Sequence, residues 1–177
     1  MPGKGPTEQQ VDFYRKEGYL VLPSFFDDRV LHEIDATIQQ MAQHAFGGED
    51  QDKILELEPE LVNGKPVVRR LYNPYDNHET FRKLARHEQL VDTVASVLGN
   101  DLNLQHSKLN LKPAKVGTVV EWHQDMGYYP LTNGDSLAAL MYLDDTTVEN
   151  GCLQVIPGVH EQPLMDHTLD GFFQGKI

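Results

Sequence analysis

The sequence lacks the features that mark secreted and membrane-embedded proteins. Its 177 residues include one cysteine, Cys152, so the chain can form neither an internal disulfide nor a zinc site built from several thiolates. No apolar run approaches the roughly 20 residues that a membrane-spanning helix needs, and residues 1–6 contain no apolar stretch of the secretory-signal type. We therefore expect a soluble, cytoplasmic protein.

Positive charge is also scarce. The chain has 15 lysine and arginine residues against 27 aspartate and glutamate residues, which gives a formal net charge of −12 at pH 7. A protein of this sign is repelled by phosphate backbones and by anionic lipid headgroups. The composition thus argues against nucleic acid and membranes as partners.

What the sequence does contain is the composition of a globular domain. Hydrophobic residues make up 40% of the chain and charged residues 24%, both ordinary for a folded protein. A chain of this length can bury a core without help from disulfides. We expect a single domain over residues 1–177.

The first hundred residues carry helix signals. Thr7 and Gln10 have capping-box spacing, which predicts a short helix that runs to about Gly18. Apolar residues at helical spacing predict a second helix from residue 28 to 46–48. A third helical stretch is predicted over residues 79–98, broken near His87 and ended by Gly99.

Strand and turn signals fill the remainder. Asn63-Gly64 predicts a two-residue hairpin turn, and the apolar run 19–22 predicts a buried strand. The acidic stretch 49–52 reads as a solvated loop. Further short strands, separated by turn signals, are predicted at residues 101–112, 118–125, 136–143 and 152–156. Regular strands after helices indicate an α+β fold that ends in a sandwich or barrel.

A possible metal-binding pair lies in the second of these late strands, where residues 121–130 read E-W-H-Q-D-M-G-Y-Y-P. On a strand, His123 and Asp125 would project to the same side. Two histidines and one carboxylate form the facial triad of non-haem Fe(II) oxygenases, so the pair could supply two of the three ligands. Taken alone the tripeptide is weak, because a histidine and an aspartate can equally bond to each other or to solvent.

The flanking residues add weight to the metal interpretation. Tyr128 and Pro130 follow W-H-Q-D, then come E-N-G-C-L at residues 149–153 and V-I-P-G-V-H at residues 155–160. In this order and at this separation, the motifs resemble the phytanoyl-CoA dioxygenase family of Fe(II)- and 2-oxoglutarate-dependent oxygenases. The upstream segments F-Y-R-K-E-G-Y-L-V-L and L-N-L-K-P are similar to that family too, so the resemblance runs from about residue 8 to the end.

The resemblance implies a double-stranded β-helix, that is, a jelly-roll or cupin-like fold, preceded by helices. The helical part would occupy residues 1–99, and the start of the jelly roll about 100–177. Only 54 residues follow His123 (177 − 123), enough for two or three more strands. We therefore expect the returning C-terminal part of the β-helix to be missing from this chain, which we read as a fragment.

The resemblance also implies a set of site residues. His123 and Asp125 would be the iron ligands and the catalytic centre. Lys108 and Asn110, two residues apart and thus on one strand face, would contact 2-oxoglutarate. Arg70 would be the family's N-terminal basic residue that meets this co-substrate, although its neighbour at position 69 fits equally well.

The implied reaction is hydroxylation of a small organic molecule or acyl conjugate, with consumption of O₂ and release of succinate and CO₂. Related halogenases lack the carboxylate ligand, so Asp125 favours hydroxylation. Two alternatives stay open. One is a catalytically inactive jelly-roll binding module, and the other is a cupin-type metalloenzyme that does not use 2-oxoglutarate. Substrate identity and oligomeric state are not indicated by the sequence.

Two parts of the family's site have no counterpart here. The last arginine is Arg86, so none follows the metal motif to clamp the distal carboxylate of oxoglutarate. Two histidines follow the motif. His160 ends the Pro-Gly-x-His turn, which in the family is not the ligand, and His167 matches no ligand pattern. We expect the third ligand to come from outside these 177 residues.

Overall fold

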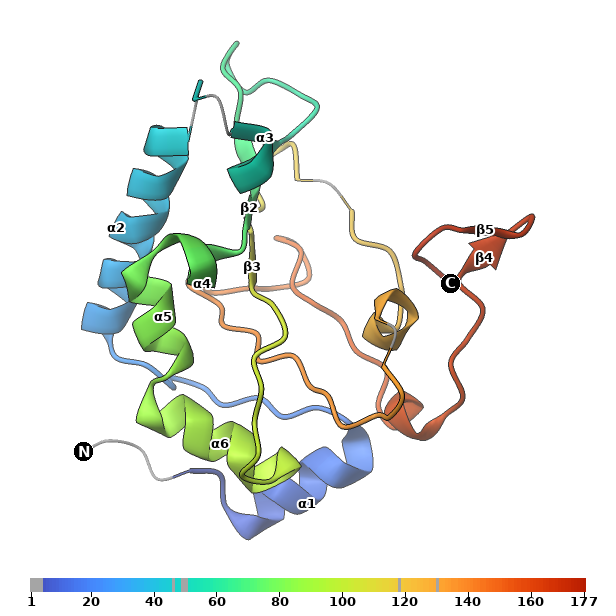
Figure 1. Cartoon of the computed structure of the whole chain (residues 1–177). Coiled ribbons are helices and arrows are strands. Elements are labelled where there is room, and N and C mark those ends of the chain that lie inside the picture. Colours follow the sequence, from blue (N-terminus) through green and yellow to red (C-terminus); the bar gives the residue numbers. More distant parts are fainter. Residues whose placement is uncertain (1–4, 46, 49–50, 118, 130) are drawn as a thin grey trace. The chain divides into compact units, whose positions relative to one another are not determined.

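The structure is a computed structural model that describes residues 5–45, 47–48, 51–117, 119–129 and 131–177 (Figure 1). The chain divides into two compact units. The first is built chiefly from Val21–Thr118 and Met141–Leu153, and the second from Pro6–Leu20, Val119–Leu140 and Gln154–Ile177. Each unit is described by itself.

Helices α2 to α6 and one small sheet make up the first unit. The helices are α2 (Asp28–Ala45), α3 (Gln51–Ile54), α4 (Pro74–Asn77), α5 (Glu79–Ala85) and α6 (Glu88–Leu98). The strands β1 (Leu55–Leu57), β2 (Val68–Tyr72) and β3 (Lys108–Asn110) form an antiparallel sheet in the order β1-β2-β3. None of the helices in the described residues combines the length and the apolar character that crossing a bilayer requires.

The core of this unit lies between α2, α5 and the sheet. Leu71 of β2 is fully buried, with 0% of its surface exposed. Its buried neighbours are Ile34, Ile38, Met41, Leu55 and Phe81. Three of these come from the apolar stripe of α2, whose helical spacing was the basis of its prediction. Burial of one sheet face by helices leaves the other face for polar residues.

The hairpin prediction at residues 63–64 is confirmed. Asn63 and Gly64 have φ values of 51° and 75°, the two positive values that a type I′ turn requires. Val62 pairs with Lys65 across the turn, and β1 and β2 pair antiparallel beyond it. The turn therefore sets which residues of β1 oppose those of β2.

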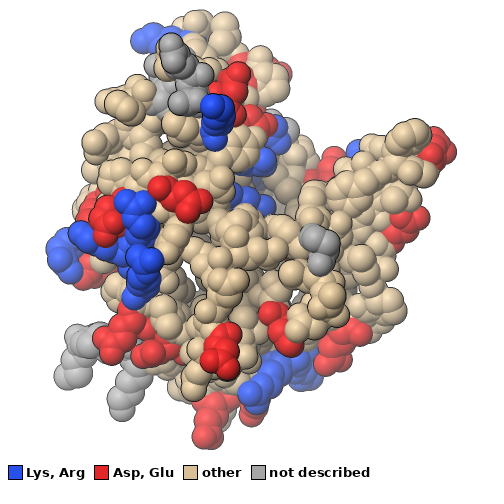
Figure 2. Space-filling view, in the orientation of Figure 1, with Lys and Arg blue, Asp and Glu red and all other residues tan. Residues whose placement is uncertain are grey.

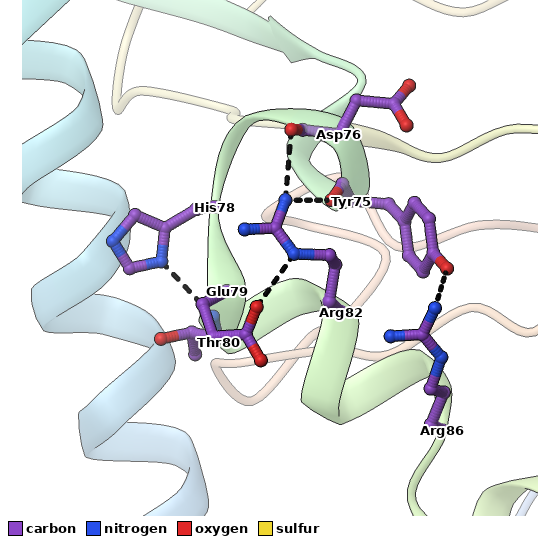
Figure 3. A network of polar contacts seen from close by, with 7 residues as sticks. All are labelled: Tyr75, Asp76, His78, Glu79, Thr80, Arg82 and Arg86. Carbon is purple, nitrogen blue, oxygen red and sulfur yellow. Dashed lines mark hydrogen bonds and ion pairs between the residues drawn. The ribbon is translucent and has the colours of Figure 1, made fainter.

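Side chains lock the corner that follows β2 (Figure 3). The Arg82 guanidinium donates to the backbone carbonyls of Tyr75 and Asp76, at 3.2 and 3.0 Å. His78 caps α5 by accepting a hydrogen bond from the Thr80 amide at 3.2 Å. These contacts fix the direction in which the chain leaves β2, and with it the end of the sheet.

The predicted break in the third helical stretch is confirmed as well. α5 ends at Ala85, α6 begins at Glu88, and Gly99 caps the end of α6. The second predicted helix ends at Ala45; position 46 lies outside the described residues. Of the acidic stretch 49–52, the first two residues also lie outside them. The loop prediction is wrong for Gln51 and Asp52, which open α3.

The second unit contains α1 (Glu8–Glu17), two 3₁₀ turns, η1 (Asp125–Tyr128) and η2 (Val159–Glu161), and the two-stranded hairpin β4 (Thr168–Leu169) and β5 (Phe172–Phe173). The predicted capping box is present. Thr7 accepts from the Gln10 amide and its own amide donates to the Gln10 side chain. Gly18 ends α1 with a φ of 81°.

Most of the predicted strands outside the hairpin are wrong. Residues 19–22 form no strand, and Val21 is 68% exposed. The segment 101–112 is a strand only at Lys108–Asn110, while 118–125, 136–143 and 152–156 contain no strand among their described residues. A strand exists through hydrogen bonds to a neighbour, and these segments have no such partner in the described residues. A mixture of helices and small antiparallel sheets is what the structure shows; the jelly roll stays a prediction.

Charged side chains of both signs lie beside one another on the face drawn in Figure 2. The lysine and arginine side chains there are accompanied by aspartate and glutamate side chains. They form no continuous positive stripe on this face, which is the footprint that nucleic-acid binding requires.

Candidate functional site: a histidine–aspartate pair and a polar sheet face

His123 and Asp125 lie in the second unit, at the start of η1. Gln124 between them is extended, with φ −109° and ψ 127°, and Asp125 then begins the 3₁₀ turn. The strand predicted here is therefore wrong, but one extended residue is enough to bring the two side chains to the same side.

The hydrogen bonds of His123 determine which ring nitrogen is available. Nδ1 lies 2.7 Å from the Glu121 carbonyl oxygen. A carbonyl can only accept, so Nδ1 carries a proton, and Nε2 is the ring nitrogen left for a metal. This arrangement, in which one nitrogen donates to a carbonyl, is the usual support of a metal-binding histidine.

The distance between the two side chains favours ligands over a mutual hydrogen bond. His123 Nε2 and Asp125 Oδ1 are 3.4 Å apart, beyond the normal hydrogen-bond range of about 2.7–3.2 Å. Two ligand atoms, each about 2.1 Å from one ion and at right angles, stand roughly 3 Å apart. The pair thus needs only a small adjustment to hold a divalent cation.

The described residues supply no complete metal site. No group of three or more His, Cys, Asp or Glu side chains among them could hold a metal ion. His160 donates from Nε2 to the Arg15 carbonyl at the end of α1, at 3.0 Å. His167 uses both ring nitrogens, toward the Gln124 amide and the Met165 carbonyl. The described residues thus bring together two candidate ligands, His123 and Asp125, and neither later histidine joins them.

Segment 165–177 contacts the turn that carries His123 and Asp125, the two side chains that we call the metal pair for their proposed role. The Met165 amide donates to the Gln124 side chain at 2.7 Å, and the Ile177 amide donates to the Trp122 carbonyl at 2.9 Å. The Tyr128 hydroxyl donates to the Gly175 carbonyl. Each of these bonds ends on a residue within three positions of the pair, so the segment fixes the turn that carries it.

Aromatic rings complete the surroundings of His123. Tyr128 lies edge-on to the His123 ring, with centroids 5.6 Å apart. Phe173 of β5 packs edge-on against Tyr128, at 5.2 Å. The ring of Tyr128, about half exposed, therefore lies against the candidate ligand rather than in a core.

The first unit carries the second group of predicted residues. In the β2–β3 pairing, Arg70 is opposite Asn110 and Tyr72 is opposite Lys108. Arg70 Nε donates to Asn110 Oδ1 at 2.9 Å. Because strand residues alternate, these side chains lie on the face opposite Leu71 and the core. We call Glu56, Arg70, Tyr72, Lys108 and Asn110 the polar sheet face.

Glu56 of β1 organises this face. Its Oε2 accepts from the Tyr72 hydroxyl at 2.7 Å and contacts Arg70 Nη1 at 3.3 Å, and its Oε1 accepts from Arg69 at 2.8 Å. The hydrogen bond from Tyr72 to Glu56 raises the pKa of that phenol above its ordinary value, and burial adds to the effect. Of the two arginines, Arg70 is the one that also reaches Asn110.

Lys108 is the free cation of the face. Within the part of the chain that the structure describes, its exposed ammonium makes no hydrogen bond or ion pair. The polar sheet face holds two cations, Arg70 and Lys108, and one carboxylate, Glu56, which Arg69 also contacts, so the face has an excess of positive charge in an acidic protein. Such a surface suits an anionic ligand.

A cleft of about 230 Å³ adjoins the same face. Glu56 and Tyr72 line it, together with Gln51, Asp52, Leu55 and Leu57. The cleft thus lies between α3 and the first two strands, and Glu56 and Tyr72 belong to both the cleft and the polar sheet face.

The structure brings together the residues within each of the two predicted groups, but the two groups belong to different units. His123 and Asp125 meet in the second unit, and Arg70, Lys108 and Asn110 meet in the first. Sequence reasoning missed Tyr72 and Glu56. The two-residue step from Arg70 to Tyr72 could have indicated the first, whereas Glu56 requires knowledge of the pairing of β1 with β2.

Comparison with known proteins now decides the family. The profile of the phytanoyl-CoA dioxygenase (PhyH) family matches residues 14–175. The chain belongs to this family. It is 33% identical over 161 residues to the "probable alpha-ketoglutarate-dependent hypophosphite dioxygenase" of Stutzerimonas stutzeri, covering 91% of this chain and 56% of that protein. It is 29% identical over 161 residues to the L-proline trans-4-hydroxylase of Streptomyces griseoviridis, covering 88% and 56%.

This PhyH-family chain spans about half the length of the curated relatives it matches. Its fold is similar to the crystal structure of EctD from S. alaskensis with bound Fe. The TM-score is 0.60 at 22% identity, and the match covers 73% of this chain and 44% of that one. The likeness supports a shared fold.

Proposed function

We propose that the protein is an Fe(II)- and 2-oxoglutarate-dependent dioxygenase that hydroxylates a small organic molecule or acyl conjugate and releases succinate and CO₂. The observation that carries the proposal is the His123–Asp125 pair, with Nε2 and Oδ1 3.4 Å apart and the other ring nitrogen occupied. Membership of the PhyH family supports it. Because the chain spans about half the length of its relatives, the proposal concerns the whole protein.

The pair would hold the iron through His123 Nε2 and Asp125 Oδ1. The Glu121 carbonyl accepts from Nδ1 of His123, so Nε2 is the ring nitrogen directed to the metal. Bound Fe(II) supplies, with O₂ and 2-oxoglutarate, the oxidising power to hydroxylate an unactivated C–H bond. The contacts of segment 165–177 with Trp122 and Gln124 would hold the two ligands at the required separation.

The polar sheet face would bind a carboxylate of 2-oxoglutarate. Lys108 offers an unengaged ammonium, and Arg70 a guanidinium whose orientation is fixed by Asn110 and Glu56. A fixed guanidinium and a mobile ammonium are both good partners of a carboxylate. A co-substrate carboxylate would compete with Glu56 for Arg70, so binding would loosen that ion pair.

The names of the relatives support a small-molecule substrate. They include a proline hydroxylase and several ectoine dioxygenases, which act on compounds of low molecular weight. For this chain the class is a proposal.

The test is formation of succinate from 2-oxoglutarate by the purified protein supplied with Fe(II) and O₂. We expect succinate to form in the wild type and to be lost in His123→Ala. The control is His32→Ala, an exposed histidine of α2, which should keep the wild-type rate. Oxoglutarate binding without any succinate would instead support the inactive binding module.

A further inference from the structure

His167 is the buried residue of segment 165–177. Its surface is 4% exposed, while the residues on either side of it are exposed. A histidine buried at this level must satisfy both ring nitrogens. It does so with two segments that meet here, the turn that carries His123 and Asp125 and its own segment just before β4.

The bonding partners define the tautomer of His167. Its Nε2 lies 2.9 Å from the Gln124 amide nitrogen, and a backbone amide can only donate. Its Nδ1 lies 2.8 Å from the Met165 carbonyl oxygen, which can only accept. The ring is therefore neutral, with the proton on Nδ1 and the lone pair of Nε2 directed at Gln124.

Gln124 is the residue between the two candidate ligands, and it is held twice. Its amide donates to His167, and its side-chain oxygen accepts from the Met165 amide at 2.7 Å. The His167 ring also lies against Gly127 of η1, where a Cβ would come within 3.3 Å of three ring atoms. The ring thus fits against a turn that has no side chain at that position.

We propose that His167 is a positioning residue for the metal pair. By accepting from the Gln124 amide it fixes the orientation of the peptide group between His123 and Asp125. The directions in which those two side chains leave the backbone follow from that peptide orientation. His167 would therefore set the 3.4 Å separation of the ligand atoms without contacting the metal. This inference rests on the proposed function.

The experiment measures Co(II) affinity by calorimetric titration, and the visible spectrum of bound Co(II), at temperatures where each variant is folded. His167→Phe keeps an aromatic ring but loses the acceptor, and we expect Co(II) to bind about 10- to 100-fold more weakly with an altered spectrum. His167→Gln keeps an acceptor near the position of Nε2 and should restore most of the affinity.

The control is Thr168→Ala, next to His167 in the sequence. It removes the hydrogen bond from the Thr168 hydroxyl to Asp166 and should leave Co(II) binding unchanged. A purely structural role predicts that both His167 variants lower the melting temperature while Co(II) affinity stays at the wild-type value. That result would overturn the proposal. Equal loss of affinity in His167→Phe and His167→Gln would overturn it too, because the acceptor would then be irrelevant.

Two further variants keep the test decisive. If His167→Phe does not fold, Gly127→Ala displaces the ring while retaining it, and unchanged Co(II) affinity there would contradict the proposal. His123→Ala separates this inference from the proposed function. If Co(II) affinity is the same in His123→Ala as in the wild type, the assignment of the metal pair is wrong. If His123→Ala lowers Co(II) affinity but the His167 variants do not, only the positioning role of His167 is wrong.

Discussion

At the scale of single residues, Glu56 determines how the polar sheet face presents its charge. One carboxylate engages Arg69, Arg70 and the Tyr72 hydroxyl. Without it, two guanidinium groups would repel each other across adjacent positions of β2. With it, Arg70 is held toward Asn110 and Lys108 is left unengaged, which is the arrangement that an incoming carboxylate can use.

The pKa of Tyr72 reports on this contact. The hydrogen bond to Glu56 raises it above the ordinary value of 10.0. In Glu56→Gln the acceptor loses its charge while Arg70 remains, so we expect the pKa of Tyr72 to fall. The measurement is an ultraviolet absorbance titration of the phenols, with Tyr72→Phe identifying the signal.

The sign of the effect on stability follows. A phenol whose pKa is raised by folding stabilises the folded state below its unfolded pKa of 10.0, and this stabilisation is lost as the pH rises through the folded value. Glu60→Gln, at an exposed position near the hairpin, is the control and should leave the Tyr72 titration unchanged. If Glu56→Gln also leaves it unchanged, the contact does not exist in solution.

At the scale of elements, the Pro-Gly-x-His turn closes the end of α1. The last carbonyls of a helix have no partner inside it. Gly158 donates its amide to the Glu17 carbonyl at 2.9 Å, and His160 donates to the Arg15 carbonyl at 3.0 Å. The motif that indicated the family thus has a structural role: it caps a helix that lies 145 residues earlier in the sequence (160 − 15).

Substitution of Gly18 tests this contact. Gly18 has a φ of 81°, and a Cβ there would overlap the His160 ring. We expect Gly18→Ala to lower the free energy of unfolding by about 1–2 kcal/mol for the left-handed conformation, with a further loss from the overlap. Chemical denaturation measures the total loss of unfolding free energy.

Two variants separate the terms in that experiment. Gly47→Ala is the control for conformation alone, since its φ is 76° with nothing within 4 Å. In the double variant Gly18→Ala, His160→Ala, removal of the ring should recover the part due to overlap. Strictly additive losses would show that Gly18 and His160 are not in contact.

The elements that could be predicted from sequence are those with local rules. Capping residues and apolar spacing within one turn specify α1, α2 and the α5–α6 break, and positive φ at Asn63 and Gly64 specifies the hairpin. The predictions of the late strands were wrong because strand pairing depends on residues far away in the sequence. Leu140 and Ile156, 58% and 57% exposed, read as strand residues, yet no described neighbour pairs with them.

The residues of the candidate site likewise differ in whether the local sequence indicates them. Motif spacing singled out His123 and Asp125, and the family resemblance singled out Lys108 and Asn110, whose two-residue spacing places both on one strand face. Glu56 and His167 were missed because each acts through a partner far away in sequence, at separations of 14 and 43 residues (70 − 56 and 167 − 124). Nothing local distinguishes such residues from ordinary surface residues.

At the scale of the whole molecule, the residues proposed for the chemistry fall into two groups, one in each unit. The second unit carries the two proposed metal ligands and the segment that contacts them, and the first carries the cationic face proposed for the co-substrate. Iron binding and oxoglutarate binding should therefore respond to different substitutions. Arg70→Ala and Lys108→Ala should weaken oxoglutarate binding and spare the metal.

The most direct measurement is the visible absorption of the purified protein with Fe(II) and 2-oxoglutarate in the absence of O₂, because the iron–oxoglutarate chelate is coloured and requires no substrate. We expect a visible band in the wild-type whole protein that is lost in His123→Ala and Asp125→Ala and that needs more oxoglutarate to appear in Lys108→Ala. A band that persists in both ligand variants, or no band in the wild type, would contradict the assignment of His123 and Asp125 as the iron ligands of an oxoglutarate-dependent dioxygenase.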